Sequence, residues 1–157
     1  MADKRFGRMF NYIIKKESLI MMINNHEKHA FSLGQQPQRL LRHEVESRLV
    51  DEVARLLSHE PEEGLGWQGS GIDLMEALHV VFATGMLEDD DGCMLQFRAI
   101  VRRACSVLHV REPRNPYELA AKASRRKGIR RSTFMRRYQL RLGRDVKTPF
   151  LDEIAKN

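Results

Sequence analysis

The 157-residue sequence predicts an all-α fold, a helical bundle with a helix-turn-helix or winged-helix-like C-terminal part and at most a minimal β wing. Three observations favour this class. Apolar residues recur at three- and four-residue steps, and no segment shows the sustained alternation of an exposed strand. Only 7% of the residues are aromatic. The eight methionines suit packed helices better than a sandwich or barrel.

Two helices are expected in the first 60 residues. Residues 8–33 repeat apolar side chains with helical spacing and end before Gly34 and Pro37. Residues 38–59 carry the clearest amphipathic pattern. Its apolar stripe comprises Leu41, Val45, Leu49, Val53 and Leu56 or Leu57. The residues placed outside the stripe are Arg42, Glu46, Arg48, Glu52 and Arg55.

A glycine-rich segment at residues 61–71 follows these helices. Its four glycines break regular structure, so it is predicted as a linker. It would join an N-terminal helical segment (1–60), which packs or dimerises, to a helical DNA-binding-like domain (72–147). Trp67, within the linker, is expected to pack on a neighbour. Residues 148–157 are predicted as a tail.

Caps and helix breakers delimit the elements of the second half. Residues 72–83 form a predicted, largely buried helix that ends at Gly85, a residue suited to a C-terminal cap. Another helix is predicted over residues 93–109, where apolar residues again recur with helical spacing.

Two further helices are predicted towards the C-terminus. The first covers residues 116–127, with Asn115 as its N-cap and proline at its first position. Ser132 or Thr133 is expected to cap the second, which ends at Leu142 before a glycine.

The formal net charge of +6 hides a strong asymmetry along the chain. Between Arg98 and Lys147, sixteen Lys and Arg stand against three acidic residues, so this segment carries +13 and the remainder carries −7. Such a division indicates a surface for a polyanion. Most of these cations are Arg, whose planar guanidinium matches phosphate and guanine edges.

The densest group of cations lies around the glycine between the last two predicted helices. A helix, a tight turn and a helix with cations at the junction are what a helix-turn-helix-like element needs to hold phosphates. The hydroxyls of Ser132 and Thr133, with the free N–H groups of that helix start, would bind one more phosphate. The predicted DNA-binding residues are Lys122, Arg125, Arg126, Lys127, Arg130, Arg131, Ser132, Thr133, Arg136 and Arg137. The alternative is a solvated helix face whose arginines pair with the acidic half of the protein.

The sequence gives little support for a metal site or an enzyme active site. His26 and His29 stand three apart, as two metal ligands on a helix can, but no third ligand has the expected spacing. The acidic turn at residues 88–92 lacks acids at the first and twelfth positions of a calcium loop. Neither a phosphate loop nor a nucleophile elbow nor a dinucleotide-binding glycine pattern occurs. No catalytic residue, metal, cofactor or small-molecule substrate is therefore predicted.

Three features favour a cytoplasmic protein without a membrane partner. The two cysteines show no disulfide or metal-binding pattern. The first residues lack the apolar stretch of a secretory signal. No apolar run approaches the roughly 18–20 residues that span a bilayer.

Short segments from Trp67 to Leu142 share residues and order with one known family. They are Trp67-Gln68-Gly69-Ser70, Asp73 to His79, Thr84 to Leu87 with Gly92, Phe97 to Leu108, Asn115-Pro116-Tyr117, Arg125 to Gly128 and Ser132-Thr133-Phe134. This order resembles the RteC family, whose members are regulatory proteins carried on conjugative elements of Bacteroides-like bacteria. The family favours Asn and Gly where this chain has an acidic turn.

The resemblance implies a DNA-binding transcriptional regulator linked to mobile-element excision or transfer, with double-stranded DNA as its partner. It also implies a winged-helix-like C-terminal region and places Arg125–Arg137 in the DNA-facing part. The residues alone leave open a protein–protein adaptor with a basic docking surface and a self-associating first helix, and a homodimer. An RNA-binding module is less favoured because paired aromatics for base stacking are lacking.

Overall fold

The computed structural model describes residues 36–125 and 132–156, with side chains from residue 41 onward. Over this part the chain is mostly helical and has one two-stranded sheet, so the predicted all-α fold with a minimal β element is confirmed. The predicted helix over residues 8–33 lies outside the described residues. The elements are α2 (Gln36–Ser58), η1 (Pro61–Glu63), β1 (Leu65–Trp67), α3 (Gly71–Thr84), α4 (Phe97–Val107), α5 (Pro116–Ser124), α6 (Phe134–Leu142), η2 (Leu151–Glu153) and β2 (Ile154–Lys156).

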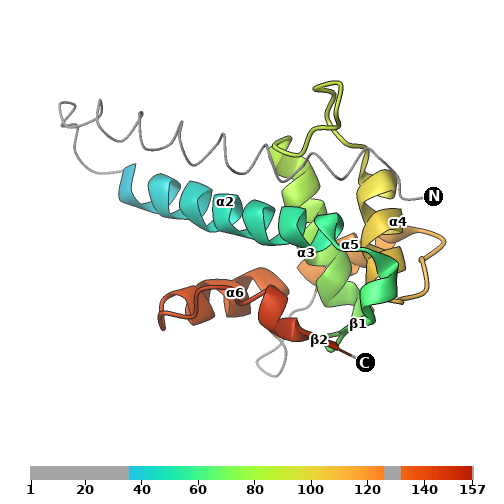
Figure 1. Cartoon of the computed structure of the whole chain (residues 1–157). Helices are drawn as coiled ribbons and strands as arrows, with labels where there is room; N and C mark the ends of the chain where they lie inside the picture. The colour runs from blue at the N-terminus through green and yellow to red at the C-terminus, as the bar shows by residue number, and fades with distance from the viewer. Residues whose placement is uncertain (1–35, 126–131, 157) are drawn as a thin grey trace.

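Helix α3 lies at the centre, and α2, α4, α5 and α6 all pack against it (Figure 1). Leu74, Leu78 and Val81 of α3 are fully buried. α2 contributes Leu49 and Val53 to the same core. Because these helices share one hydrophobic cluster, they hold the basic C-terminal part of the described chain in a fixed position.

Local capping explains where α3 begins and ends. The Ser70 hydroxyl accepts from the N–H of Asp73 at 3.2 Å, and the Trp67 indole donates to the Ser70 carbonyl at 3.0 Å. A Cβ on Gly69 would lie 2.9 Å from the Trp67 ring, so this turn requires glycine. Gly85 ends the helix at φ 66°, which confirms the predicted glycine cap.

A short antiparallel hairpin over residues 87–95 connects α3 to α4. Glu88 pairs with Met94, and Leu87 and Leu95 are hydrogen-bonded at its base. The start predicted for the next helix at Cys93 is therefore wrong, because residues 93–95 pair across the hairpin and α4 begins only at Phe97.

The caps predicted for the last two helices are confirmed. The Asn115 side chain accepts from the N–H of Glu118 at the start of α5, and Thr133 caps α6. α5 ends at Ser124, whereas the sequence prediction extended it to about Lys127.

The chain end returns to the segment predicted as a linker. β1 and β2 pair antiparallel, and the N–H of Gln68 donates to the carbonyl of Glu153 at 2.8 Å. Phe150 is fully buried, with its ring 5.3 Å from that of Trp67, so the expected packing of Trp67 is confirmed. Residues 61–71 and 148–156 thus carry the sheet and both 3-10 helices of the described chain.

Candidate nucleic-acid interface

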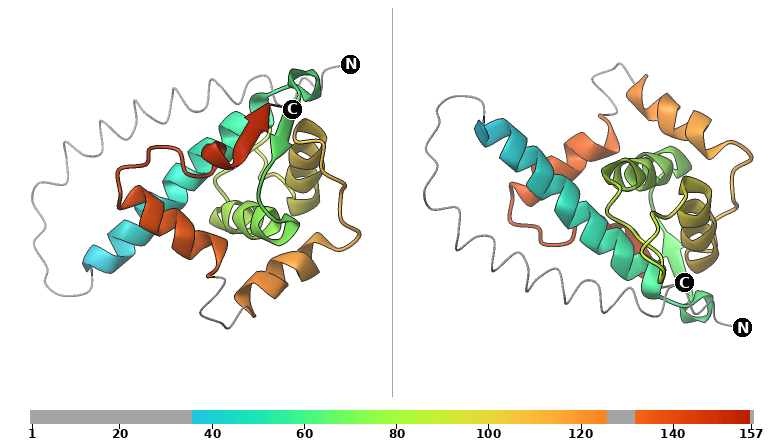
Figure 2. Two further views of the ribbon diagram at one scale, coloured as in Figure 1. Left: turned by 90° about the horizontal axis from the view of Figure 1, so that it is seen from below. Right: turned by 90° about the horizontal axis from the view of Figure 1, so that it is seen from above.

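The predicted DNA-binding residues that the structure describes lie at the facing ends of two helices. Lys122 and Arg125 end α5, and Arg136 and Arg137 lie in the first turn of α6. Both views in Figure 2 show these two helix ends at the same side of α3. The predicted residues outside the described part are Arg126, Lys127, Arg130 and Arg131.

α5 and α6 are each positioned by α3. α5 packs along α3 over most of its length, and α6 meets α3 near its start. Residues 125–133 connect the two helices, and 126–131 of them lie outside the described part. The orientation of the two helix ends therefore depends on the central helix.

The N-terminus of α6 is capped from inside the protein. The carboxylate of Glu76, a buried side chain of α3, accepts from the N–H groups of Phe134 at 2.9 Å and Met135 at 3.2 Å. The Thr133 hydroxyl accepts from the N–H of Arg136 at 3.3 Å. The amides that the sequence suggested for a phosphate are thus already bound to a carboxylate, which satisfies the positive end of the helix.

Arg137 is also used within the fold. Its guanidinium lies 3.0 Å from the Asp73 carboxylate of α3 and donates to the Ser132 carbonyl at 2.9 Å. One charge is therefore shared between α3, α6 and the segment that precedes α6. This contact fixes the direction in which the chain enters α6, and it leaves less of the Arg137 charge for a ligand.

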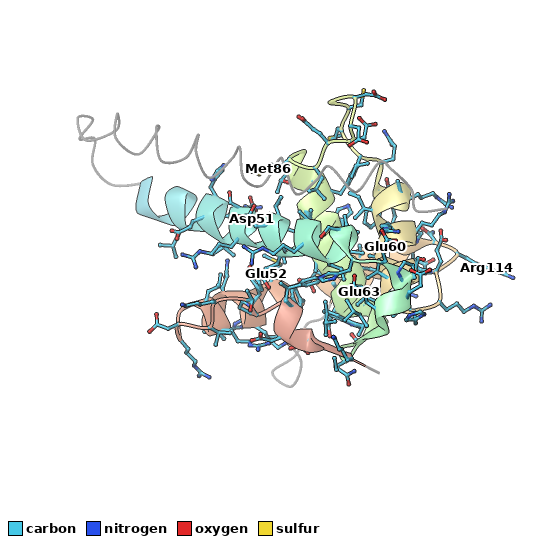
Figure 3. All side chains as sticks on the ribbon, viewed as in Figure 1. Asp51, Glu52, Glu60, Glu63, Met86 and Arg114 are labelled. Carbon is cyan, nitrogen blue, oxygen red and sulfur yellow. The ribbon has the colours of Figure 1, made fainter. Side chains whose placement is uncertain are left out.

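Glu52 corrects the sequence prediction, which placed it on the polar side of its helix. Its side chain is only 3% exposed and its carboxylate accepts from the Tyr138 hydroxyl at 2.7 Å. It also accepts from the N–H groups of Phe150 at 2.8 Å and Leu151 at 2.9 Å. Burial raises the pKa of the Glu52 carboxyl, although these hydrogen bonds act in the opposite direction. Figure 3 shows Glu52 where α2 faces α6.

Two more arginines of the basic C-terminal segment form contacts within the fold and are therefore not free to bind a ligand. Arg103 donates to the carbonyls of Leu57 at 3.1 Å and His59 at 2.7 Å, and its side chain is 11% exposed. Arg141 donates to the Pro149 carbonyl and lies about 3 Å from the carboxylates of Asp152 and Glu153. Spacing along the chain carries no signal for these roles, because the partners of Arg103 lie more than 40 positions away.

Arg125 and Arg136 differ from these internal arginines. Both are exposed, and neither guanidinium forms a hydrogen bond or ion pair with another residue in the described ranges. Lys122 is exposed as well, and its ammonium lies 3.2 Å from Glu118 one helical turn away. Such an exposed pair contributes little to stability, so Lys122 can exchange its partner for a phosphate at small cost.

The acidic and basic ends of the protein are far apart. Glu88, Asp89, Asp90 and Asp91 form the tip of the hairpin beyond the C-terminus of α3, at the top of Figure 1. α6 contacts the other end of α3 through Asp73 and Glu76. α3 has fourteen residues and therefore spans about 21 Å. This separation keeps the acidic tip away from an anion bound at the α5–α6 ends.

An open groove of about 880 Å³ lies between the first half of α2 and the end of α6. Leu41, which is 65% exposed, and Val45 line its α2 side, and Leu142 and Val146 line the other. Its charged residues are Arg42, Glu44, Arg48, Asp145 and Lys147. Because both signs are present, the groove is not matched to a polyanion.

No family model, curated protein or solved structure matches the chain. The resemblance to the RteC family therefore stays a prediction. Among the helices of the described part, none is long and apolar enough to cross a membrane. The described residues also hold no group of three or more metal-ligating side chains, and His26 and His29 lie outside those residues.

Proposed function

We propose that this protein binds double-stranded DNA where α5 and α6 meet. Seven cations of the sequence define the surface, which we call the basic junction. They are Lys122, Arg125, Arg126, Lys127, Arg130, Arg131 and Arg136. Ser132, Thr133 and Arg137 support this surface through the internal contacts described above.

The observation that carries the proposal is the pair Arg125 and Arg136. Both are exposed and without a partner among the described side chains, and they lie at the two helix ends between which the chain carries four more cations. Like charges at such density repel one another, so the arrangement costs stability unless an anion binds. A DNA duplex presents regularly spaced phosphates that would neutralise them.

We further propose that DNA binding serves transcriptional control at a mobile element. This part rests on the resemblance of residues 67–142 to the RteC family. The separation of the exposed cations at the α5–α6 ends from the acidic hairpin is in keeping with a protein that binds a polyanion.

The test of the basic junction is the double variant Arg130→Ala/Arg131→Ala. Its DNA affinity should fall, and the slope of log affinity against log salt should become shallower by about one unit for each phosphate that the variant no longer binds. The matched control is Arg42→Ala/Arg48→Ala, which removes the same charge from the exposed side of α2. Equal decreases in affinity for the two double variants, or no decrease for the first, would contradict the assignment.

A protein–protein adaptor is the second candidate, favoured by the groove beside Leu41. In that case the basic junction docks on an acidic protein partner. Such a protein would bind DNA weakly and without sequence preference, and roughly 0.2 M salt would abolish that binding.

A further inference from the structure

The outward side of α4 carries basic and neutral polar side chains. Arg98, Arg102 and Ser106 follow one another at four-residue steps, so they line one stripe of the helix, and all three are exposed. We call these three residues the α4 arginine face. The opposite side of the helix is anchored in the core by fully buried residues such as Phe97 and Val101. The face is therefore held rigidly and points away from the protein.

Exposed charges on α2 are balanced, whereas those on α4 are not. On α2, Arg42 lies 2.8 Å from Glu46, and Arg48 lies 3.0 Å from Glu44, each pair one turn apart. The sequence of α4 contains no acidic residue. A helix face that is merely solvated has no reason to exclude one sign of charge.

The placement of these arginines opposes the stability of α4. Arg98 lies in the first turn, where the positive end of the helix dipole disfavours a cation. Arg98 and Arg102 are also like charges one turn apart, which repel each other. Arg102 has Glu112 as an acidic neighbour at 3.7 Å, but its side chain remains 73% exposed. The arrangement is therefore better explained by an external anion than by folding.

The surroundings of α4 extend the same surface. Arg111 and Arg114 are exposed in the loop after the helix, and Figure 3 shows Arg114 projecting away from the protein. Tyr117 at the start of α5 is 46% exposed, with its ring 4.7 Å from that of Phe97. Both views in Figure 2 place α4 on the side of α3 away from α6.

We propose that α4 is the helix that enters the major groove, with Arg98 and Arg102 contacting guanine edges. This inference rests on the proposed function. An α-helix fits the major groove, and the guanidinium of arginine donates two hydrogen bonds to O6 and N7 of guanine. Arg111 and Arg114 of the loop after α4 then hold phosphates beside the helix.

The neighbouring helices are less suited to this role. The exposed side of α5 includes Glu118, whose charge would repel phosphates. In α6, Arg137 and Arg141 already form ion pairs within the fold. Among these helices, α4 is the one whose own exposed face carries two arginines and no acidic residue.

The experiment uses the full chain and a duplex that the wild-type protein selects from a random pool. Affinities for this duplex and for a scrambled one are compared for Arg102→Lys, Arg98→Ala/Arg102→Ala and Arg55→Lys. Lysine keeps the charge but cannot form the two-pronged hydrogen bond, so the affinity of Arg102→Lys should fall about 10-fold on the selected duplex and little on the scrambled one. Arg55 is an exposed arginine on α2, so its lysine variant should bind as the wild type does.

The outcomes separate this inference from the proposed function. A wild-type protein that shows no preference for any duplex overturns specific DNA binding, and the role of α4 with it. A wild-type protein that discriminates, with Arg102→Lys and Arg98→Ala/Arg102→Ala unchanged in their discrimination, overturns the role of α4 alone. Thermal unfolding followed by circular dichroism should give melting temperatures for both α4 variants no lower than the wild-type value, since the replaced side chains are exposed.

Discussion

Replacement of Glu52 by alanine tests how the C-terminal part of the chain is held in place. The Glu52 carboxylate binds three donors, namely the Tyr138 hydroxyl and the amides of Phe150 and Leu151. Each buried donor left without a partner costs about 1–3 kcal/mol. Because the amide of Leu151 is only partly buried and water can replace the carboxylate there, we expect the lower part of that range. The predicted decrease in the free energy of unfolding is therefore about 3–5 kcal/mol.

Urea denaturation monitored by far-ultraviolet circular dichroism measures this decrease. Glu44→Ala is the matched control, since Glu44 is 62% exposed and pairs with Arg48 on the same helix. The control should be destabilised by no more than about 0.5 kcal/mol. The reasoning is refuted if Glu52→Ala is destabilised by less than about 1 kcal/mol, because three donors cannot be left buried and unpaired at so small a cost.

Two further predictions concern titratable groups. Burial raises the folded-state pKa of Glu52 above 4.5, so the folded protein holds this proton more tightly than the unfolded chain. The contribution of Glu52 to stability should therefore decrease as pH rises from 4.5 through that pKa. The Glu52→Gln variant cannot lose this proton, so its urea midpoint should not show the decrease seen in the wild type. Parallel pH profiles of the two urea midpoints would contradict the prediction. Burial also raises the pKa of the Cys105 thiol to about 11, while Cys93 is exposed. A thiol reagent at pH 8 should titrate one cysteine in the native protein and two after unfolding, and two rapidly reacting native thiols would disprove the burial of Cys105.

Local signals in the sequence were sufficient for most helix boundaries. Asn115 before a proline, Thr133 before an apolar turn and Gly85 after an apolar run each act on backbone groups within three or four positions. The start of α4 was misplaced because the hairpin pairs residues 93–95 with residues 87–89, and no capping residue reveals such pairing. The sequence allowed a minimal β wing but did not place its strands, since β1 and β2 lie about 90 positions apart.

The roles of the individual arginines could not be predicted from the sequence. The concentration of cations after Arg98 is visible in the sequence, but their roles depend on partners distant along the chain. Arg137 binds Asp73 and Arg103 binds two carbonyls, whereas Arg102 points outward beside Arg103. Glu52 was assigned to the polar side although it stands three positions after Leu49 and seven after Val45, a spacing that fits the buried stripe.

The most direct test of DNA binding is a fluorescence-anisotropy titration of the wild-type protein. The probe is a duplex pool from the DNA upstream of its own coding sequence, with a scrambled competitor, at two salt concentrations. Our account predicts binding that survives both the competitor and physiological salt, with an affinity that falls steeply as salt rises. Binding that disappears with competitor or at physiological salt would contradict it and would leave the basic junction as a docking surface for an acidic protein.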